Sequence, residues 1–155
     1  MGSSLRLFAL TTAAFLLGAI PAAHAALPDH VMEANASRMA AGAYHTCALR
    51  TDDTPTCWGD DGNHQAAVPD GTGSLRAIAA GDYHTCAIKT DRTPLCWGNN
   101  SHDRATLPDN IGTVTAITAG GSHTCAIKTG GTPLCWGKND DGQSTIPDGI
   151  DTVTS

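Results

Sequence analysis

The sequence has little positive charge, few aromatic residues and no recognisable catalytic motif. Its formal net charge is −6, and no cluster of lysine or arginine interrupts the acidic balance. Nucleic-acid binding depends mainly on cationic side chains that contact phosphates, so this composition argues against a nucleic-acid partner. The chain also lacks a nucleophile beside a base, a pair of carboxylates placed for acid–base chemistry, and a glycine-rich phosphate loop. We therefore expect a protein that is not an enzyme and uses no cofactor.

Long apolar runs are also absent, except near the start of the chain. Residues 7–20 form an apolar stretch that follows Arg6 and ends at Pro21. A helix that spans a bilayer needs about 20 apolar residues, so this stretch is too short. Ala23-His24-Ala25 fits the small-residue box of a cleavage site. We expect residues 1–25 to be a signal peptide and residues 26–155 to be secreted or periplasmic, with no membrane span after cleavage. The alternative is an uncleaved membrane anchor.

The sequence does contain one motif that occurs three times. His-Thr-Cys-Ala is followed each time by Pro-x-Cys-Trp-Gly, and Trp58, Trp97 and Trp136 recur every 39 residues. A fixed period of this length indicates a repeat architecture. We divide residues 26–155 into units of about 27–67, 68–106 and 107–145, with a partial unit at 146–155.

Each copy of the motif predicts a β-hairpin. Turn residues lie between the two limbs, at Asp52-Asp53 in the first unit, Asp91-Arg92 in the second and Gly130-Gly131 in the third. Such a turn sets the two cysteines of a unit opposite each other on paired strands, within reach of a disulfide bond. Six cysteines in an exported chain favour three disulfides. The expected pairs are Cys47–Cys57, Cys86–Cys96 and Cys125–Cys135.

Alternation along the strands assigns side chains to two faces of each hairpin. His45, Cys47 and Leu49 share one face, while Trp58 points to the other, over small residues. Further strands are predicted at residues 74–81 and 113–120, and a fourth strand of the unit near 143–146. Residues 31–39 make a poor strand, as suits a terminal repeat.

The pattern Ala-Gly-x-x-His-Thr-Cys-Ala-Ile-Lys-Thr, followed by Cys-Trp-Gly-x-Asn-x-x-Gly-Gln, resembles the regulator-of-chromosome-condensation repeat. The resemblance implies a β-propeller, typically of seven four-stranded blades. We expect an all-β fold, a partial β-propeller of about three blades, each with a cross-strand cysteine pair. One part of the pattern departs from the family. Its Gly-Gln pair is present only as Gly142-Gln143, so we expect altered turns at His64-Gln65 and Asp103-Arg104.

The paired cysteines and the export signal are also similar to those of secreted bacterial propellers that inhibit β-lactamase, which implies an inhibitory role. Little more than three units fit in the chain, and we expect it to be a fragment of a longer propeller. A self-associating arc is the second interpretation and a free-standing solenoid the third. An open arc exposes apolar blade faces and unpaired strand edges, which favours association with another chain.

The function favoured by this fold is binding of another protein through loops at one end of the blades, because rigid scaffolds carry recognition on their loops. Tyr44 and Tyr83 are candidate anchors, since tyrosine is enriched at binding hot spots. The alternative is that both rings only cover the blade edge. The full set of candidate binding residues is Tyr44, Tyr83, Asp60, Asp61, Asn99, Asn100, Lys138 and Asn139.

Two other classes of function were weighed. The family's eponymous member is a guanine-nucleotide exchange factor, but the signal peptide and the acidic charge argue against that role. A metal-binding or redox protein is the other alternative, because His45, Cys47 and Cys57 converge on one face. Zinc would require four ligands in a closed site, and Cys-x₉-Cys is not a usual zinc spacing. We therefore expect no metal site.

Overall fold

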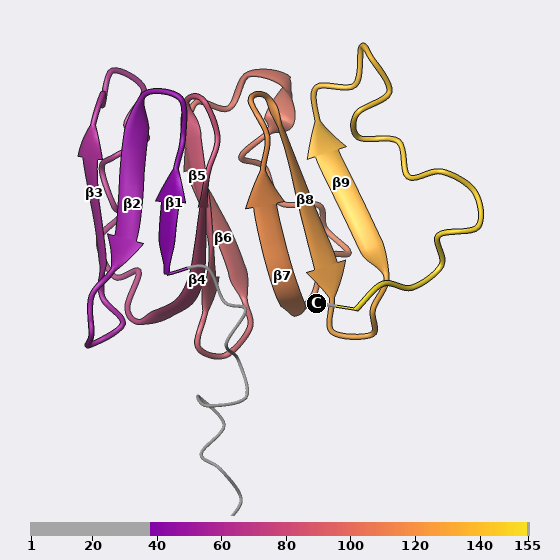
Figure 1. Ribbon diagram of the computed structural model, residues 1–155, viewed down its shortest axis with the longest axis horizontal. Helices are drawn as coiled ribbons and strands as arrows, with labels where there is room; N and C mark the ends of the chain where they lie inside the picture. The colour runs from indigo at the N-terminus through magenta and orange to yellow at the C-terminus, as the bar shows by residue number, and fades with distance from the viewer. Residues whose placement is uncertain (1–37, 155) are drawn as a thin grey trace, which may run out of the picture. The chain divides into compact units, whose positions relative to one another are not determined.

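The computed structural model describes residues 38–154, which form three small β-sheets (Figure 1). The predicted signal peptide and the first residues of the first unit lie outside the described residues. The strands are β1 (Met39–Ala41), β2 (His45–Leu49), β3 (Pro55–Gly59), β4 (Leu75–Ala80), β5 (His84–Lys89), β6 (Pro94–Gly98), β7 (Val114–Ala119), β8 (His123–Lys128) and β9 (Pro133–Gly137). A short 3-10 helix, η2 (Ser101–Asp103), follows β6.

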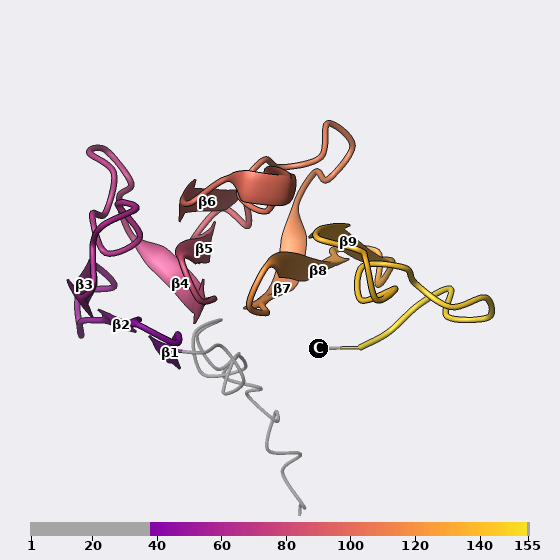
Figure 2. The same cartoon turned by 90° about the horizontal axis from the view of Figure 1, so that it is seen from above.

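Each sheet is an antiparallel meander of three strands in chain order: β1-β2-β3, β4-β5-β6 and β7-β8-β9. Seen from above, the sheets fan out like blades, with β1, β4 and β7 at their inner edges (Figure 2). The prediction of an all-β fold with three blades is confirmed. The first inner strand, β1, covers three residues where β4 and β7 each cover six, in keeping with the poor strand pattern before Met39.

The prediction of a fourth strand near residues 143–146 is wrong. Within residues 38–154 every sheet has three strands, and in residues 143–146 a turn at 143–144 is followed by irregular chain. The Asn139 carboxamide oxygen accepts the Ser144 backbone N–H at 2.9 Å, and the Thr145 N–H donates to the Gly142 carbonyl at 3.0 Å. These N–H groups are used locally, so they do not contribute to a strand ladder.

The hairpin register follows the prediction. Cys47 pairs with Cys57, Cys86 with Cys96 and Cys125 with Cys135, and each pair forms a disulfide. The turns lie where the sequence placed them, and the left-handed conformation falls on the second residue of each predicted turn pair, with φ of 64° at Asp53, 71° at Arg92 and 86° at Gly131.

Consecutive blades are joined by the same backbone contact. The N–H of the first residue of β4, Leu75, donates to the carbonyl of Asp53 in the preceding hairpin turn at 2.9 Å. Val114 of β7 donates to Arg92 in the same way at 3.0 Å, and Val153 donates to Gly131 at 2.8 Å. The first residues of β4 and β7 are therefore tied to the hairpin before them, and Val153, which lies in no assigned strand, makes the same contact.

The apolar core lies between the blades. Cys47 and Leu49 of the first blade pack with Ile78 and Trp97 of the second. An equivalent cluster joins Ile88 of the second blade to Trp136 and other residues of the third. The two faces predicted from strand alternation are thus confirmed: the cysteine face of one blade meets the tryptophan face of the next.

Candidate functional site

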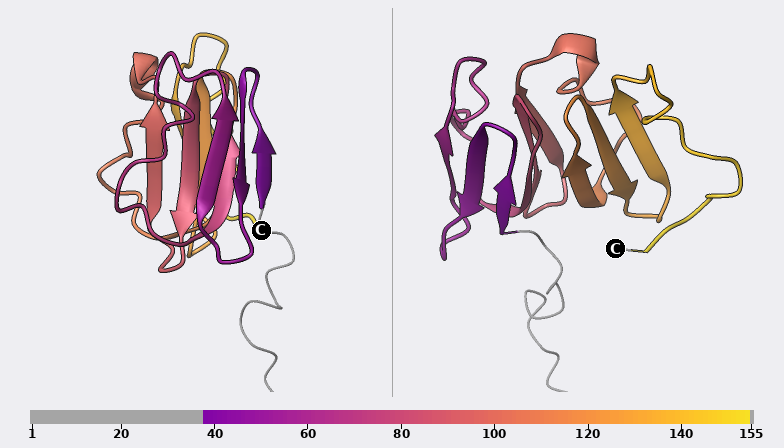
Figure 3. Two further views of the ribbon diagram at one scale, coloured as in Figure 1. Left: turned by 90° about the vertical axis from the view of Figure 1, so that its left-hand side faces the viewer. Right: turned by 45° about the horizontal axis from the view of Figure 1, so that its top comes forward.

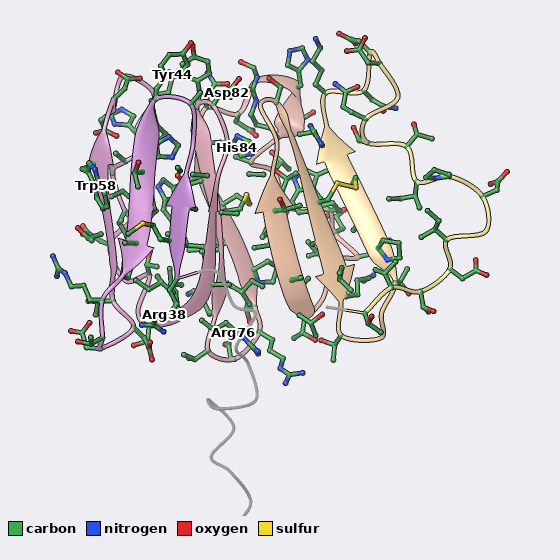
Figure 4. All side chains as sticks on the ribbon, viewed as in Figure 1. Arg38, Tyr44, Trp58, Arg76, Asp82 and His84 are labelled. Atoms are coloured by element: carbon green, nitrogen blue, oxygen red, sulfur yellow. A yellow bond between two sulfur atoms is a disulfide. The ribbon has the colours of Figure 1, made fainter. Side chains whose placement is uncertain are left out.

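The loops predicted to bind a partner gather at one end of the blades, which we call the Tyr44 end (Figure 3). It comprises the loops that precede β2, β5 and β8 and the loops that follow β3, β6 and β9. Backbone hydrogen bonds hold the two sets together. The Asp60 N–H donates to the Tyr44 carbonyl at 2.9 Å, and the Asn99 N–H donates to the Tyr83 carbonyl at 2.8 Å. Figure 4 shows Tyr44 and Asp82 at this end and Arg38 and Arg76 at the opposite end.

The two candidate tyrosines form a single aromatic surface. Their rings stack with centroids 4.9 Å apart at an interplanar angle of 21°. Tyr44 is 54% exposed, and Tyr83 is partly buried. Hydrogen bonding to the Tyr44 hydroxyl raises the pKa of Tyr83, and burial and the Asp82 and Asp60 carboxylates act in the same direction. The Tyr83 phenol therefore stays neutral at ordinary pH.

Carboxylates border this aromatic stack. Asp60 is exposed, and its Oδ2 accepts a hydrogen bond from the Gln65 carboxamide at 2.6 Å. Asp82, which directly precedes Tyr83, lies against Gly121 of the next blade. The sequence reasoning missed Asp82, although a carboxylate beside a candidate anchor could have been noticed.

Three of the predicted binding residues accept hydrogen bonds from backbone N–H groups of their own loops. Asp61 Oδ1 accepts the N–H groups of Ala66 and Ala67, both at 2.9 Å. Asn100 and Asn139 occupy the equivalent positions and accept equivalent N–H groups at 3.0 Å and 2.9 Å. A side chain engaged in this way has little left to offer a partner.

The remaining two candidates differ in their surroundings. Asn99 bridges two units, because its Nδ2 donates to Asn63 Oδ1 at 2.8 Å. Lys138 lies 3.4 Å from the exposed carboxylate of Asp140. Tyr44, Asp60 and, in part, Tyr83 thus form the accessible surface, whereas Lys138 belongs to the third blade and is not placed beside the tyrosine stack by any described contact. A binding role for any of these residues stays a prediction.

The expectation of altered turns where Gly-Gln is missing is wrong for His64-Gln65. At Asp103-Arg104 the turn does differ, because His102 also has a positive φ, of 61°, within η2. His64 and Asp103 adopt positive φ angles of 60° and 56°, in the left-handed region like Gly142 at 79°. Each N–H also donates to the residue three positions earlier, at 2.9 Å for His64 and 3.1 Å for Asp103 and Gly142. A side-chain acceptor at the equivalent positions Asp61, Asn100 and Asn139 supports this backbone hydrogen bond where the glycine is missing.

A hydrogen-bonded relay between blades was not foreseen. His45 Nε2 meets Thr85 Oγ1 of the next blade at 2.7 Å, and Thr85 Oγ1 in turn donates to the Gln65 carbonyl at 2.8 Å. The Trp97 indole N–H donates to the same carbonyl at 3.0 Å. The second interface repeats the arrangement with His84, Thr124, Trp136 and the carbonyl of Arg104.

The relay assigns the histidine tautomer. A threonine hydroxyl has one proton, and here it goes to the loop carbonyl, so the hydroxyl must accept from the histidine Nε2–H. The other nitrogen, Nδ1, is buried without a partner in both His45 and His84 among the described residues. Burial lowers the pKa of His84 to about 4, and the positive charge of Arg104 adds to the shift. The imidazole is therefore neutral and structural.

The same histidines were the basis of the metal alternative. All six cysteines are engaged in disulfides, so the predicted His/Cys sets have no thiolates to offer a metal ion. Across residues 38–154, no group of three His, Cys, Asp or Glu side chains is placed to hold one.

A family model described as "Regulator of chromosome condensation (RCC1) repeat" matches residues 37–65, 75–104 and 114–143. No curated protein sequence matches the chain. Three solved structures with the same fold are informative, and two of them are ectodomains of plant receptor kinases. That of CR4 from Physcomitrella patens is 28% identical, with a TM-score of 0.57 over 70% of this chain and 31% of that one. That of ACR4 from Arabidopsis thaliana is 30% identical, with a TM-score of 0.57 over 73% and 39%.

The third structure is Kap60 bound to yeast RCC1 (Prp20), at 20% identity and a TM-score of 0.61 over 74% of this chain and 35% of that one. At this identity the likeness concerns the fold alone. The chain spans between 31% and 39% of the length of these three matched chains. In the part of the chain described by the structure, no helix is long and apolar enough to cross a membrane.

Proposed function

The chain belongs to the regulator of chromosome condensation (RCC1) repeat family, and from this premise we propose that it is an exported protein-binding module whose Tyr44 end contacts another protein. The observation that carries the proposal is the stacked pair Tyr44–Tyr83, which presents a 54% exposed ring on a scaffold of disulfide-linked hairpins. Aromatic residues held in place contribute contact area at low entropic cost.

Relatives support the binding role. The structure that contains yeast RCC1 (Prp20) is of a complex with Kap60, and two other matched structures are receptor ectodomains. Three disulfides support an exported protein, since disulfides persist in oxidising compartments. No feature of the described residues favours the guanine-nucleotide exchange alternative, because the fold alone does not carry that activity.

The surface around the stack suggests the chemistry of the partner. The Asp60 and Asp82 carboxylates lie close enough to Tyr83 to raise its pKa, so the aromatic surface has a negative border. An arginine or lysine of a partner would gain both a cation–π contact with an exposed ring and an opposite charge. We propose a partner whose contact surface is basic.

Site-specific photo-crosslinking tests this proposal. A benzophenone side chain in place of Tyr44 should link the chain to a partner in the exported fraction of the cells that make it. The same group at Thr90, exposed in a hairpin turn at the opposite end, is the control. Labelling at residue 44 but not at residue 90 is expected, and Asp60→Asn should weaken it. Equal labelling at both positions, or none at residue 44, would contradict the proposal.

We extend the proposal to inhibition, since a rigid end that covers an active site blocks substrate access. Once mass spectrometry identifies the crosslinked protein, its activity is measured with and without the chain. The double variant Tyr44→Ala, Tyr83→Ala should relieve the inhibition, whereas Thr90→Ala should not. A partner whose activity is unchanged by saturating chain would refute the inhibitory role but leave binding intact.

A further inference from the structure

The interface between the first and second blades and the interface between the second and third use the same hydrogen-bond donors and acceptors. One blade supplies a histidine Nε2–H and a loop carbonyl, from His45 and Gln65 or from His84 and Arg104. The next blade supplies a threonine hydroxyl and an indole N–H. Each contact thus has two complementary sides, and this sequence forms it twice.

The outer flank of the first blade presents the side with the threonine hydroxyl and the indole N–H. Among the described residues, no blade contacts this side in the way seen at the two internal interfaces. We call it the head face, defined by Thr46, Ala48 and Trp58. Trp58 is 51% exposed, whereas Trp97 and Trp136 are 7% and 9% exposed. Within residues 38–154, no carbonyl accepts its indole N–H. Figure 4 shows Trp58 on this flank.

The outer flank of the third blade carries the opposite side. We call it the tail face, defined by His123, Ile127, Gln143 and Ile150. His123 stands at the position of His45 and His84, but no hydroxyl among the described residues meets its ring. Ile150 is 42% exposed, whereas Ile111, its equivalent one repeat earlier, is 7% exposed and lies in the core between the second and third blades.

We propose that the head face of one copy of this chain docks on the tail face of a second copy. His123 Nε2–H donates to Thr46 Oγ1 of the second copy. That hydroxyl and the Trp58 indole N–H of the second copy both donate to the Gln143 carbonyl. The occupant is a second copy because the two faces are the two halves of a contact that this chain already makes with itself, with the same residue types at the same repeat positions.

The association is head-to-tail, and such an interface closes into a ring when the rotation between copies permits. The three described blades of one copy would then continue into those of the next. Thr56 stands where Leu95 and Leu134 pack in the internal interfaces, so the new interface is less apolar and dissociates on dilution.

Sedimentation velocity of the full chain, purified as the cell processes it, gives the first test. We expect a concentration-dependent shift from one copy to two. Tryptophan emission should move to shorter wavelength over the same range, because Trp58 is the exposed tryptophan of the described residues. Trp58→Ala should raise the dissociation constant by roughly 30-fold or more, as expected for a buried hot-spot tryptophan. Thr90→Ala, at an exposed turn position of the second blade, is the control.

A mixing experiment separates this interface from any symmetric one. Trp58→Ala damages the head face and Ile150→Asp damages the tail face, and both side chains are exposed, so the fold should survive. Each variant alone should be monomeric, while an equimolar mixture regains one intact interface and should form a heterodimer. A wild-type chain that stays monomeric at every concentration would overturn the proposal, as would a mixture that stays monomeric while the wild type dimerises. Neither result bears on the Tyr44 end, so this proposal and the partner proposal fail separately.

Discussion

His84 is a buried imidazole whose two nitrogens have different surroundings. Nε2–H donates to Thr124 Oγ1 at 2.9 Å, and Nδ1 has no partner among the described residues. A proton added at Nδ1 would place a positive charge in a site without an acceptor. Burial is accordingly the main cause that lowers the pKa of His84 from 6.5 to about 4. Burial also lowers the pKa of His45.

This geometry predicts acid sensitivity. The unfolded chain takes up a proton at His84 near pH 6.5, while the folded chain takes it up near pH 4. The stability of the neutral form is therefore complete above pH 6.5 and is lost as the pH falls from 6.5 towards 4. Urea unfolding across this range should show a falling free energy of unfolding. The pKa values of Asp52 and Asp91 are lowered from 3.8, so these carboxylates contribute below this window.

The variant His84→Gln identifies the residue responsible. A glutamine amide keeps a donor for Thr124 but does not titrate, so the loss of stability between pH 6.5 and 4 should become shallower. Thr90→Ala, at an exposed turn position, should leave the pH profile as in the wild type. An unchanged profile in His84→Gln would show that another group causes the acid sensitivity.

Thr85 joins two partners through one hydroxyl, which makes it the most sensitive polar residue of the first interface. Replacement with valine keeps the shape but leaves the His45 Nε2–H buried without an acceptor. We expect Thr85→Val to lower the free energy of unfolding by about 1–3 kcal/mol. Thr46→Val, at the equivalent position of the head face, should cost less than about 0.5 kcal/mol in the monomer. Equal losses from the two variants in chemical denaturation would contradict the relay.

At the scale of the element, the hairpins were predictable because their signals are local. The distance from Cys86 to Cys96 and the turn residues between them determine the register, and strand alternation determines the faces. The relay was not predictable in this way, since His45 and Thr85 lie in different blades and neither forms a recognised motif alone. The turn at His64 was misjudged because the missing glycine outweighed the Asx hydrogen bonds of Asp61 that keep it. The fourth strand was misjudged because the strand pattern near Ser144 does not reveal that the Ser144 and Thr145 N–H groups form local hydrogen bonds.

Gly98 ends β6 where the backbone approaches the β4–β5 loop closely. Its φ is +99°, and a Cβ added there would lie 2.7 Å from the Tyr83 carbonyl oxygen and 2.9 Å from His84 Cα. Gly112 also has a positive φ, of +61°, but a Cβ there would meet nothing within 4 Å. We expect Gly112→Ala to cost about 1 kcal/mol for the left-handed backbone and Gly98→Ala to cost about 2–3 kcal/mol more through the clash. Thermal and urea unfolding of both variants measure the difference, and equal costs would contradict it.

At the scale of the described unit, residues 38–154, each blade contacts its neighbours through one repeated interface, so stability resembles a sum over blades and interfaces. The sequence predicted the number of blades, because the 39-residue period counts them. The open arc expected from that count also implied outer faces without a neighbouring blade, although Trp58, Trp97 and Trp136 occupy equivalent positions in their units. Their exposures of 51%, 7% and 9% follow from position in the array and not from local sequence.

The three disulfides each lie within one blade, so the contacts between blades do not substitute for them. Each closes a loop with a sequence separation of 10 residues, and such a loop contributes about 3 kcal/mol in the chain-entropy model. Three of them together rival the whole stability of a small domain, about 5–15 kcal/mol. We expect full reduction, verified by thiol titration, to abolish the cooperative unfolding transition seen by circular dichroism. The double variant Cys125→Ala, Cys135→Ala should retain a transition with a lower midpoint, because two blades keep their links. A fully reduced chain with an unchanged midpoint would contradict this dependence. If the dependence holds, the chain folds stably only in an oxidising compartment, which is the compartment that the predicted signal peptide, residues 1–25, would deliver it to.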